Sequence, residues 1–219
     1  MRTRVPLYKQ LQGVPVTSAT LSSLLRDYKR PLDKIAQLVR DGFLIKLRRD
    51  LYLCVPMDSD DRPYSQGLIA NHLVPHSYVS FETVLSQEGI IPERSYLIKS
   101  ASLSRPISYS NPTGNYQFIP VPAPYFPIGV SPKKTDQGLY YLAASPEKAL
   151  CDLIVSTPNL RIQSLKAMHS YLENFLRIDT DSINSLDPSI IQECSLHTIK
   201  KSNELQLLKK LVSSLSSTY

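Results

Sequence analysis

Residues 31–55 read PLDKIAQLVRDGFLIKLRRDLYLCV, and this stretch decides the fold expected for the N-terminal part of the chain. Its opening proline suits the first turn of a helix, apolar residues follow at helical spacing, and Gly42 is a helix stop. Two strand-like runs come next, at residues 43–47 and 51–55, with the polar residues 48–50 between them. The stretch therefore predicts a helix followed by a tight two-stranded hairpin.

A second helix is expected directly before this stretch. Thr17-Ser18-Ala19-Thr20 supplies capping residues, and Leu21, Leu24 and Leu25 follow as one apolar edge. Residues 27–30 form a polar turn between the two helices. Helix, turn, helix and hairpin in this order are typical of a winged helix-turn-helix. We assign this domain to residues 1–60.

The net charge of the chain is +6, and the charge is unevenly distributed. Residues 1–55 contain eleven Lys and Arg against four Asp, a net of +7. Residues 56–219 contain fourteen Lys and Arg against fifteen Asp and Glu, a net of −1. A positive excess confined to one end indicates a polyanionic partner for that end.

The helix predicted over residues 31–41 carries polar side chains suited to DNA. Lys34, Gln37 and Arg40 are spaced three apart and share the face opposite the apolar side. Gln pairs with adenine, and Arg and Lys prefer guanine or phosphate, although a solvated helix face has the same polar pattern. Two arginines at a hairpin tip favour contact with phosphate or the minor groove. The residues expected to contact double-stranded DNA are Lys29, Arg30, Lys34, Gln37, Arg40, Lys46, Arg48 and Arg49.

The rest of the chain predicts a second domain. Residues 57–63 are acidic and polar, end in proline and are interpreted as a linker. Residues 65–219 predict a mixed α+β domain with antiparallel strands and a helical C-terminal part. Helices are expected over residues 80–88 and from Ser145-Pro146-Glu147 onward, where a capping serine precedes a first-turn proline. Strand-like runs lie at residues 96–98, 107–109, 116–119 and 139–142, and late helices are expected around 165–176 and 205–215.

Few residues of the second domain suggest chemistry. Lys148 and Asp152 have i,i+4 spacing and are expected to form an exposed ion pair, while the helix start accounts for Glu147. His72 and His76 have the spacing of a zinc pair, but a proline breaks the helix between them and no acid completes the set. We therefore expect no catalytic residues, no metal site and no cofactor.

The sequence also carries a prediction about location. Cys54, Cys151 and Cys194 are odd in number and widely spaced, which favours free thiols in a reducing compartment. No apolar run approaches the roughly 18–20 residues that span a bilayer, and the N-terminal residues lack the apolar core of a secretory signal. The expected location is the cytoplasm, without a membrane partner.

Three stretches, in this order, resemble the AbiEi antitoxins of type IV toxin–antitoxin systems: residues 38–52, 77–93 and 144–153, the last reading ASPEKALCDL. Asp50 stands where that family usually has glycine, and Asp tolerates left-handed turn geometry better than most residues. The resemblance implies a DNA-binding antitoxin and autorepressor that binds the operator of its own operon. It further implies a nucleotidyltransferase-like toxin as functional partner, counteracted without a stable complex.

Two other hypotheses stay open at this point. In the first hypothesis, the chain is an enzyme such as a nuclease, which docks on DNA through the winged helix and has its active site in the second domain. Alternatively, the winged helix binds another protein, in which case binding is insensitive to salt.

Overall fold

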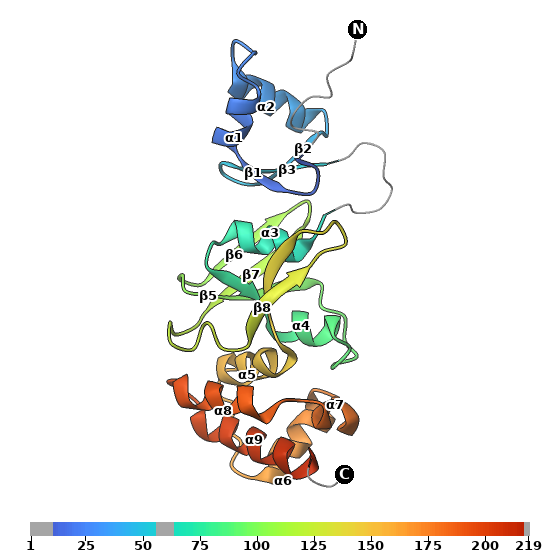
Figure 1. The fold of residues 1–219 in the computed structure, drawn as a ribbon, viewed down its shortest axis with the longest axis vertical. Coiled ribbons are helices and arrows are strands. Elements are labelled where there is room, and N and C mark those ends of the chain that lie inside the picture. Colours follow the sequence, from blue (N-terminus) through green and yellow to red (C-terminus); the bar gives the residue numbers. More distant parts are fainter. Residues whose placement is uncertain (1–10, 56–63, 217–219) are drawn as a thin grey trace.

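The computed structural model describes residues 11–55 and 64–216. Within these ranges the chain is mixed α+β, with nine α-helices, one short π-helix and two β-sheets. Along the longest axis (Figure 1), a small N-terminal unit lies at one end, a six-stranded sheet lies in the middle, and a layer of helices lies at the other end. None of the described helices is long and apolar enough to cross a membrane.

The N-terminal unit contains two helices on a three-stranded antiparallel sheet. Its elements are β1 (Pro15–Thr17), α1 (Ser18–Leu24), α2 (Pro31–Arg40), β2 (Leu44–Arg48) and β3 (Leu51–Cys54), with strand order β1-β3-β2. The side chain of Thr17 caps α1 by accepting from the backbone N–H of Thr20. Gly42 follows α2 at φ +77°, as expected of a helix stop, and Asp50 in the hairpin turn has φ +59°, so its left-handed conformation is confirmed.

The core of this unit is apolar and local. Leu21, Leu25, Ile35, Leu38 and Leu44 are each less than a twentieth exposed and pack together. The predicted helices and hairpin are confirmed, whereas β1 was not predicted. A three-residue strand is too short to show alternation, and β1 forms because it pairs with β3.

The central sheet has the strand order β6-β7-β5-β4-β9-β8. Its strands are β4 (Ser77–Val79), β5 (Leu97–Ser102), β6 (Ile107–Asn111), β7 (Gly114–Pro120), β8 (Val130–Lys134) and β9 (Tyr140–Ala144). The predicted antiparallel sheet is wrong in two places, because β5 pairs parallel with β7 and β4 pairs parallel with β9. Alternation of apolar residues determines which face of a strand is buried but not the direction of its neighbour.

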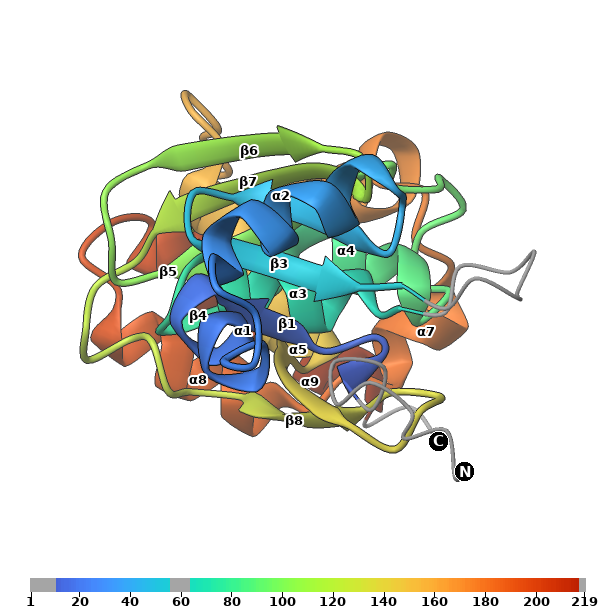
Figure 2. The ribbon, with the colours of Figure 1, turned by 90° about the horizontal axis from the view of Figure 1, so that it is seen from above.

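Helices cover both faces of this sheet. Helix α3 (Gln66–Leu73) lies on the side facing the N-terminal unit, and α4 (Phe81–Gln87) and α5 (Pro146–Ser156) lie on the other (Figures 1 and 2). A C-terminal layer packs beyond α5 and contains α6 (Leu165–Ser170), the short π-helix η2 (Tyr171–Phe175), α7 (Thr180–Asn184), α8 (Pro188–His197) and α9 (Ser202–Ser216). The helices expected after residue 80 and at Ser145 are confirmed, and Ser145 Oγ accepts from the backbone N–H of Lys148 at 3.3 Å.

The two units share part of their core. Leu47, Leu51 and Leu53 of the N-terminal sheet pack into the apolar cluster of the second unit. The carboxamide of Asn111 donates to the backbone carbonyl of Leu47 at 3.2 Å. The β2–β3 hairpin therefore lies against the second unit, with α1 and α2 on its far side (Figure 1). The predicted linker at residues 57–63 lies outside the described residues.

Candidate nucleic-acid interface

Helix α2 has one side in the core and the other in solvent. Ile35 and Leu38 are both 2% exposed, whereas Gln37 and Arg40 are exposed. Lys34 is half-buried: its Nζ donates to Gln37 Oε1 at 3.1 Å and lies 5.2 Å from the centre of the Tyr28 ring. The structure therefore brings Lys34, Gln37 and Arg40 together on one outward face, as their spacing predicts.

The turn before α2 adds further cations. Lys29 and Arg30 are exposed, and Arg30 forms an ion pair with Asp33 at 3.3 Å that is also exposed and therefore weak. Arg26 is also exposed, and the sequence did not single it out because it lies after the end of α1 and before the polar turn predicted at residues 27–30. Lys29, Arg26 and Arg40 form no ion pair with any described residue. We call the exposed or half-exposed residues Arg26, Lys29, Arg30, Lys34, Gln37 and Arg40 the basic face.

Two apolar side chains lie on the outer side of α2 as well. Leu32 and Ala36 recur at helical spacing with Ile35 and Leu38, which predicts that they belong to the buried stripe, and this prediction is wrong: Leu32 is 67% exposed and Ala36 is exposed. The helix is amphipathic, but only Ile35, Leu38 and part of Val39 reach the small core. Of these two, Ala36 is small and suited to contact with a thymine methyl group in a major groove.

The hairpin separates the two arginines that the sequence places together at its tip. The Arg49 side chain is 96% exposed and lies 3.6 Å from the Asp50 carboxylate. Arg48 is half-buried; its guanidinium donates to the Arg49 carbonyl at 3.2 Å, and it lines a cleft between the two units. The cause is a register shift between Lys46 and Arg48, since a bulge turns the following side chains onto another face. Lys46 remains exposed on β2.

A second cluster of polar side chains lies around α5, and here the predicted exposed ion pair is wrong. Lys148 Nζ and Asp152 Oδ1 are 3.1 Å apart, and both side chains are completely buried. Asp152 Oδ2 also accepts from Tyr78 Oη at 3.0 Å and Ser80 Oγ at 2.6 Å, and Lys148 donates to the Tyr125 carbonyl. Helix α5 lies between the sheet and α8, so its polar residues are buried on every side.

This cluster brings residues from two distant stretches of the chain into contact. Tyr78 and Ser80 belong to residues 77–93, and Lys148 and Asp152 belong to residues 144–153. The pKa of the Tyr78 hydroxyl is raised by burial and by the neighbouring Asp152 carboxylate. Glu147 is 8% exposed and accepts from the backbone N–H of Asp187, so it joins α5 to the start of α8. The arrangement connects elements of the core, and its carboxylates do not face solvent.

The histidines and cysteines considered in the sequence do not form a site in the structure. His72 is in the last turn of α3, with Nδ1 bonded to the Leu68 carbonyl, and His76 lies beyond the end of the helix at φ +58°. Among the described residues, no group of three or more His, Cys, Asp or Glu could hold a metal ion. The three cysteines are buried and free, and burial raises the pKa of Cys54 to about 11.

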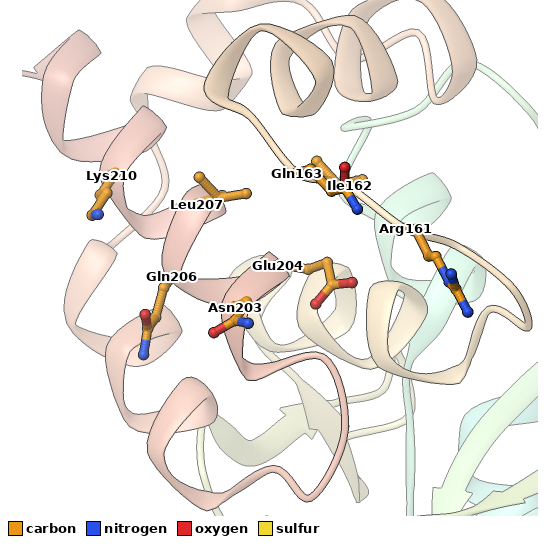
Figure 3. Close-up of a pocket in the computed structure, with 8 residues that line it drawn as sticks. All are labelled: Arg161, Ile162, Gln163, Asn203, Glu204, Gln206, Leu207 and Lys210. Atoms are coloured by element: carbon orange, nitrogen blue, oxygen red, sulfur yellow. The ribbon is translucent and has the colours of Figure 1, made fainter.

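A further cleft lies in the C-terminal layer, at the opposite end of the molecule from α2. It has a volume of about 580 Å³ and is formed by residues 161–163 and by α9 (Figure 3). Its charged side chains are Arg161, Glu204 and Lys210, which come from both edges and are of both signs. This open, mixed surface contrasts with the basic face.

The chain was also compared with known proteins. No protein-family model matches it. A search of curated proteins likewise finds no significant match.

Proposed function

We propose that the N-terminal unit is a winged helix-turn-helix that binds double-stranded DNA through the basic face. The observation that carries this proposal is the outward side of α2, where Lys34, Gln37 and Arg40 project beside the cations of the preceding turn. The order of helix, turn, helix and hairpin supports it. So does the position of α2 at one end of the molecule, where a duplex can approach without meeting the central sheet (Figures 1 and 2).

The side chains divide naturally into two roles. Gln37 and Arg40 have the chemistry to read adenine and guanine edges, and Ala36, four positions before Arg40 on the same helix, would contact a thymine methyl group. The contact of Lys34 with Tyr28 and Gln37 restrains a long side chain before DNA arrives, which lowers the entropy lost on binding. The exposed cations Arg26, Lys29, Arg30, Lys46 and Arg49 would contact phosphates and fix the position of the domain on the duplex.

We further propose that the protein is a cytoplasmic antitoxin and autorepressor of a type IV toxin–antitoxin operon. This rests on the ordered resemblance of three stretches, two of which meet at Asp152 in the core. Its functional partner would be a nucleotidyltransferase-like toxin that it counteracts without a stable complex. Asp152, the carboxylate that a nuclease hypothesis would use, is 1% exposed and bonded to Lys148, and we assign it a structural role.

The DNA proposal is tested by fluorescence anisotropy with a duplex from the region upstream of the gene. The variant Lys29→Ala/Arg40→Ala removes two cations of the basic face, and Lys166→Ala/Lys210→Ala removes two exposed cations from α6 and α9. We expect the first to weaken binding by about ten- to a hundredfold, since each lost contact costs roughly 1 kcal/mol or more. The matched control should bind as the parent does. Equal affinities of the two variants would contradict the proposal.

The antitoxin proposal has its own test. A nucleotidyltransferase-like gene beside this one should arrest growth when expressed alone, and co-expression of this chain should restore growth. The resemblance implies that the second unit is the antitoxin module, so the Lys29→Ala/Arg40→Ala variant should still restore growth while losing repression of a reporter. An adjacent gene whose toxicity this chain leaves unchanged would refute the antitoxin role and leave the DNA-binding role standing.

A further inference from the structure

A cleft with a volume of about 500 Å³ lies where the N-terminal unit meets the second unit. Its walls come from both: Thr17, Arg48 and Leu51 belong to the first, and Asn71, Tyr140 and Leu142 are among those from the second. Sites for small organic ligands have volumes of about 300–1,000 Å³ and occur preferentially where domains meet. The cleft is therefore of the right size and in the right place to bind a small molecule.

The charge of the cleft is of one sign. Among the described lining residues, Arg48 is the one side chain with a fixed charge, and none is acidic. Its Nε is buried and has no hydrogen-bond partner among the described residues, while its terminal nitrogen donates to the Arg49 carbonyl. A guanidinium offers five donors in a planar fork, and a buried donor without an acceptor is costly. Because Arg48 lines the cleft, an oxyanion bound there would lie against its guanidinium.

The rest of the lining is suited to an apolar body. Tyr140 is 59% exposed and Leu142 is 40% exposed, and both project from β9 beside Leu51 and Pro132. The carboxamide of Asn71 already bonds to the backbone of Leu142, which fixes that wall. His72 donates from Nδ1 to the Leu68 carbonyl, so its Nε2 remains for a polar group of a ligand.

We propose that this cleft binds a small molecule with a carboxylate or phosphate group on Arg48 and a ring-sized apolar body against Tyr140 and Leu142. The proposal gives Arg48 a role different from that of Arg49, which points into solvent one residue further along the hairpin. A molecule held there contacts both units at once, and binding therefore stabilises their packing. The site does not depend on DNA binding.

The absence of tryptophan from the chain allows a direct test. Tyr140→Trp places a single indole on the wall of the cleft, and its fluorescence is titrated with phenyl phosphate, benzoate and inorganic phosphate. We expect a saturable change with an aromatic anion and a weaker response to inorganic phosphate. The tighter of phenyl phosphate and benzoate identifies the anionic group. Arg48→Gln in this background should weaken binding by about tenfold or more, and Arg49→Gln should leave it unchanged.

A measurement without the reporter guards against an effect of the indole. In the protein with Tyr140, the tighter anion should raise the thermal midpoint, and Arg48→Gln should abolish the rise while Arg49→Gln keeps it. No saturable change with either aromatic anion, or equal binding by the Arg48→Gln and Arg49→Gln proteins, overturns the proposal. The proposal is also overturned if the Arg48→Gln protein binds the aromatic anion as the parent does and loses as much DNA affinity as the Arg49→Gln protein.

Discussion

The ion pair of Lys148 and Asp152 gives the sharpest prediction about stability. Asp152→Asn keeps the shape of the side chain and an oxygen that can accept from Tyr78 and Ser80, but it leaves the Lys148 ammonium buried without a counter-charge. Breaking a fully buried pair in this way costs about 3–5 kcal/mol of the free energy of unfolding. Removing a single hydrogen bond to the carboxylate, with Ser80→Ala, should cost about 1.5–3 kcal/mol.

The double variant Lys148→Met/Asp152→Leu isolates the pairing. It removes both charges, so no ammonium is left buried without a counter-charge. The remaining loss of stability comes from the hydroxyls of Tyr78 and Ser80, which lose their acceptor. We expect the double variant to be less destabilised than the sum of Lys148→Met and Asp152→Leu by at least about 2 kcal/mol. As a matched control, Glu88→Gln breaks the exposed pair with Lys133 and should cost less than about 1 kcal/mol.

The assay is urea unfolding followed by far-UV circular dichroism, with tyrosine fluorescence as a second probe to check that the two transitions coincide. If Asp152→Asn and Glu88→Gln unfold at the same urea concentration, Lys148 and Asp152 do not form a buried, charged pair. Additive costs in the double variant would show that the two groups do not interact.

Further predictions concern the packing of Gly67, the Cys54 thiol and the turn residue Asp50. Gly67→Ala should lower the free energy of unfolding, measured by urea titration, by about 1–3 kcal/mol, because an added Cβ overlaps the Tyr141 ring. Adding Tyr141→Leu to the same chain should recover part of this loss. The Cys54 thiol should resist a thiol reagent at pH 8 in the folded protein, because burial raises its pKa to about 11. Since this pKa is higher in the folded than in the unfolded chain, the stabilising contribution of Cys54 is complete below pH 9 and is lost as pH rises to about 11, so the free energy of unfolding should fall over this window. A Cys54→Ala protein whose free energy of unfolding falls equally over the same window would exclude the effect. Asp50→Asn should keep the left-handed turn and remove an acid beside Arg49, so we expect DNA affinity, measured by fluorescence anisotropy, to rise about a few-fold. An unchanged or weaker affinity would count against Arg49 as a phosphate contact.

Local sequence signals predicted the N-terminal unit well. Capping residues, the first-turn proline of α2, Gly42 and the polar residues 48–50 act over a few positions, and the structure has helices and a hairpin where they indicate. The shared outward face of Lys34, Gln37 and Arg40 also follows from spacing alone. These features needed no knowledge of the rest of the chain.

Features that depend on distant contacts were not predictable in this way. Arg48 leaves the hairpin tip because a bulge and the packing of Leu47 on the second unit set its direction. Lys148 and Asp152 look like a surface pair until α8 and the central sheet enclose α5. The parallel pairings of the central sheet depend on which strands meet, and residue patterns within one strand do not determine this.

The most direct test of DNA binding by the basic face is the salt dependence of affinity for the upstream duplex. We expect the logarithm of the binding constant to fall linearly with the logarithm of salt concentration. Lys29→Ala/Arg40→Ala should reduce the magnitude of this slope by about one to two, because each phosphate contact contributes close to one. Lys166→Ala/Lys210→Ala should keep the slope of the parent. No binding by the intact protein at low salt, or binding that does not change with salt, would contradict the account.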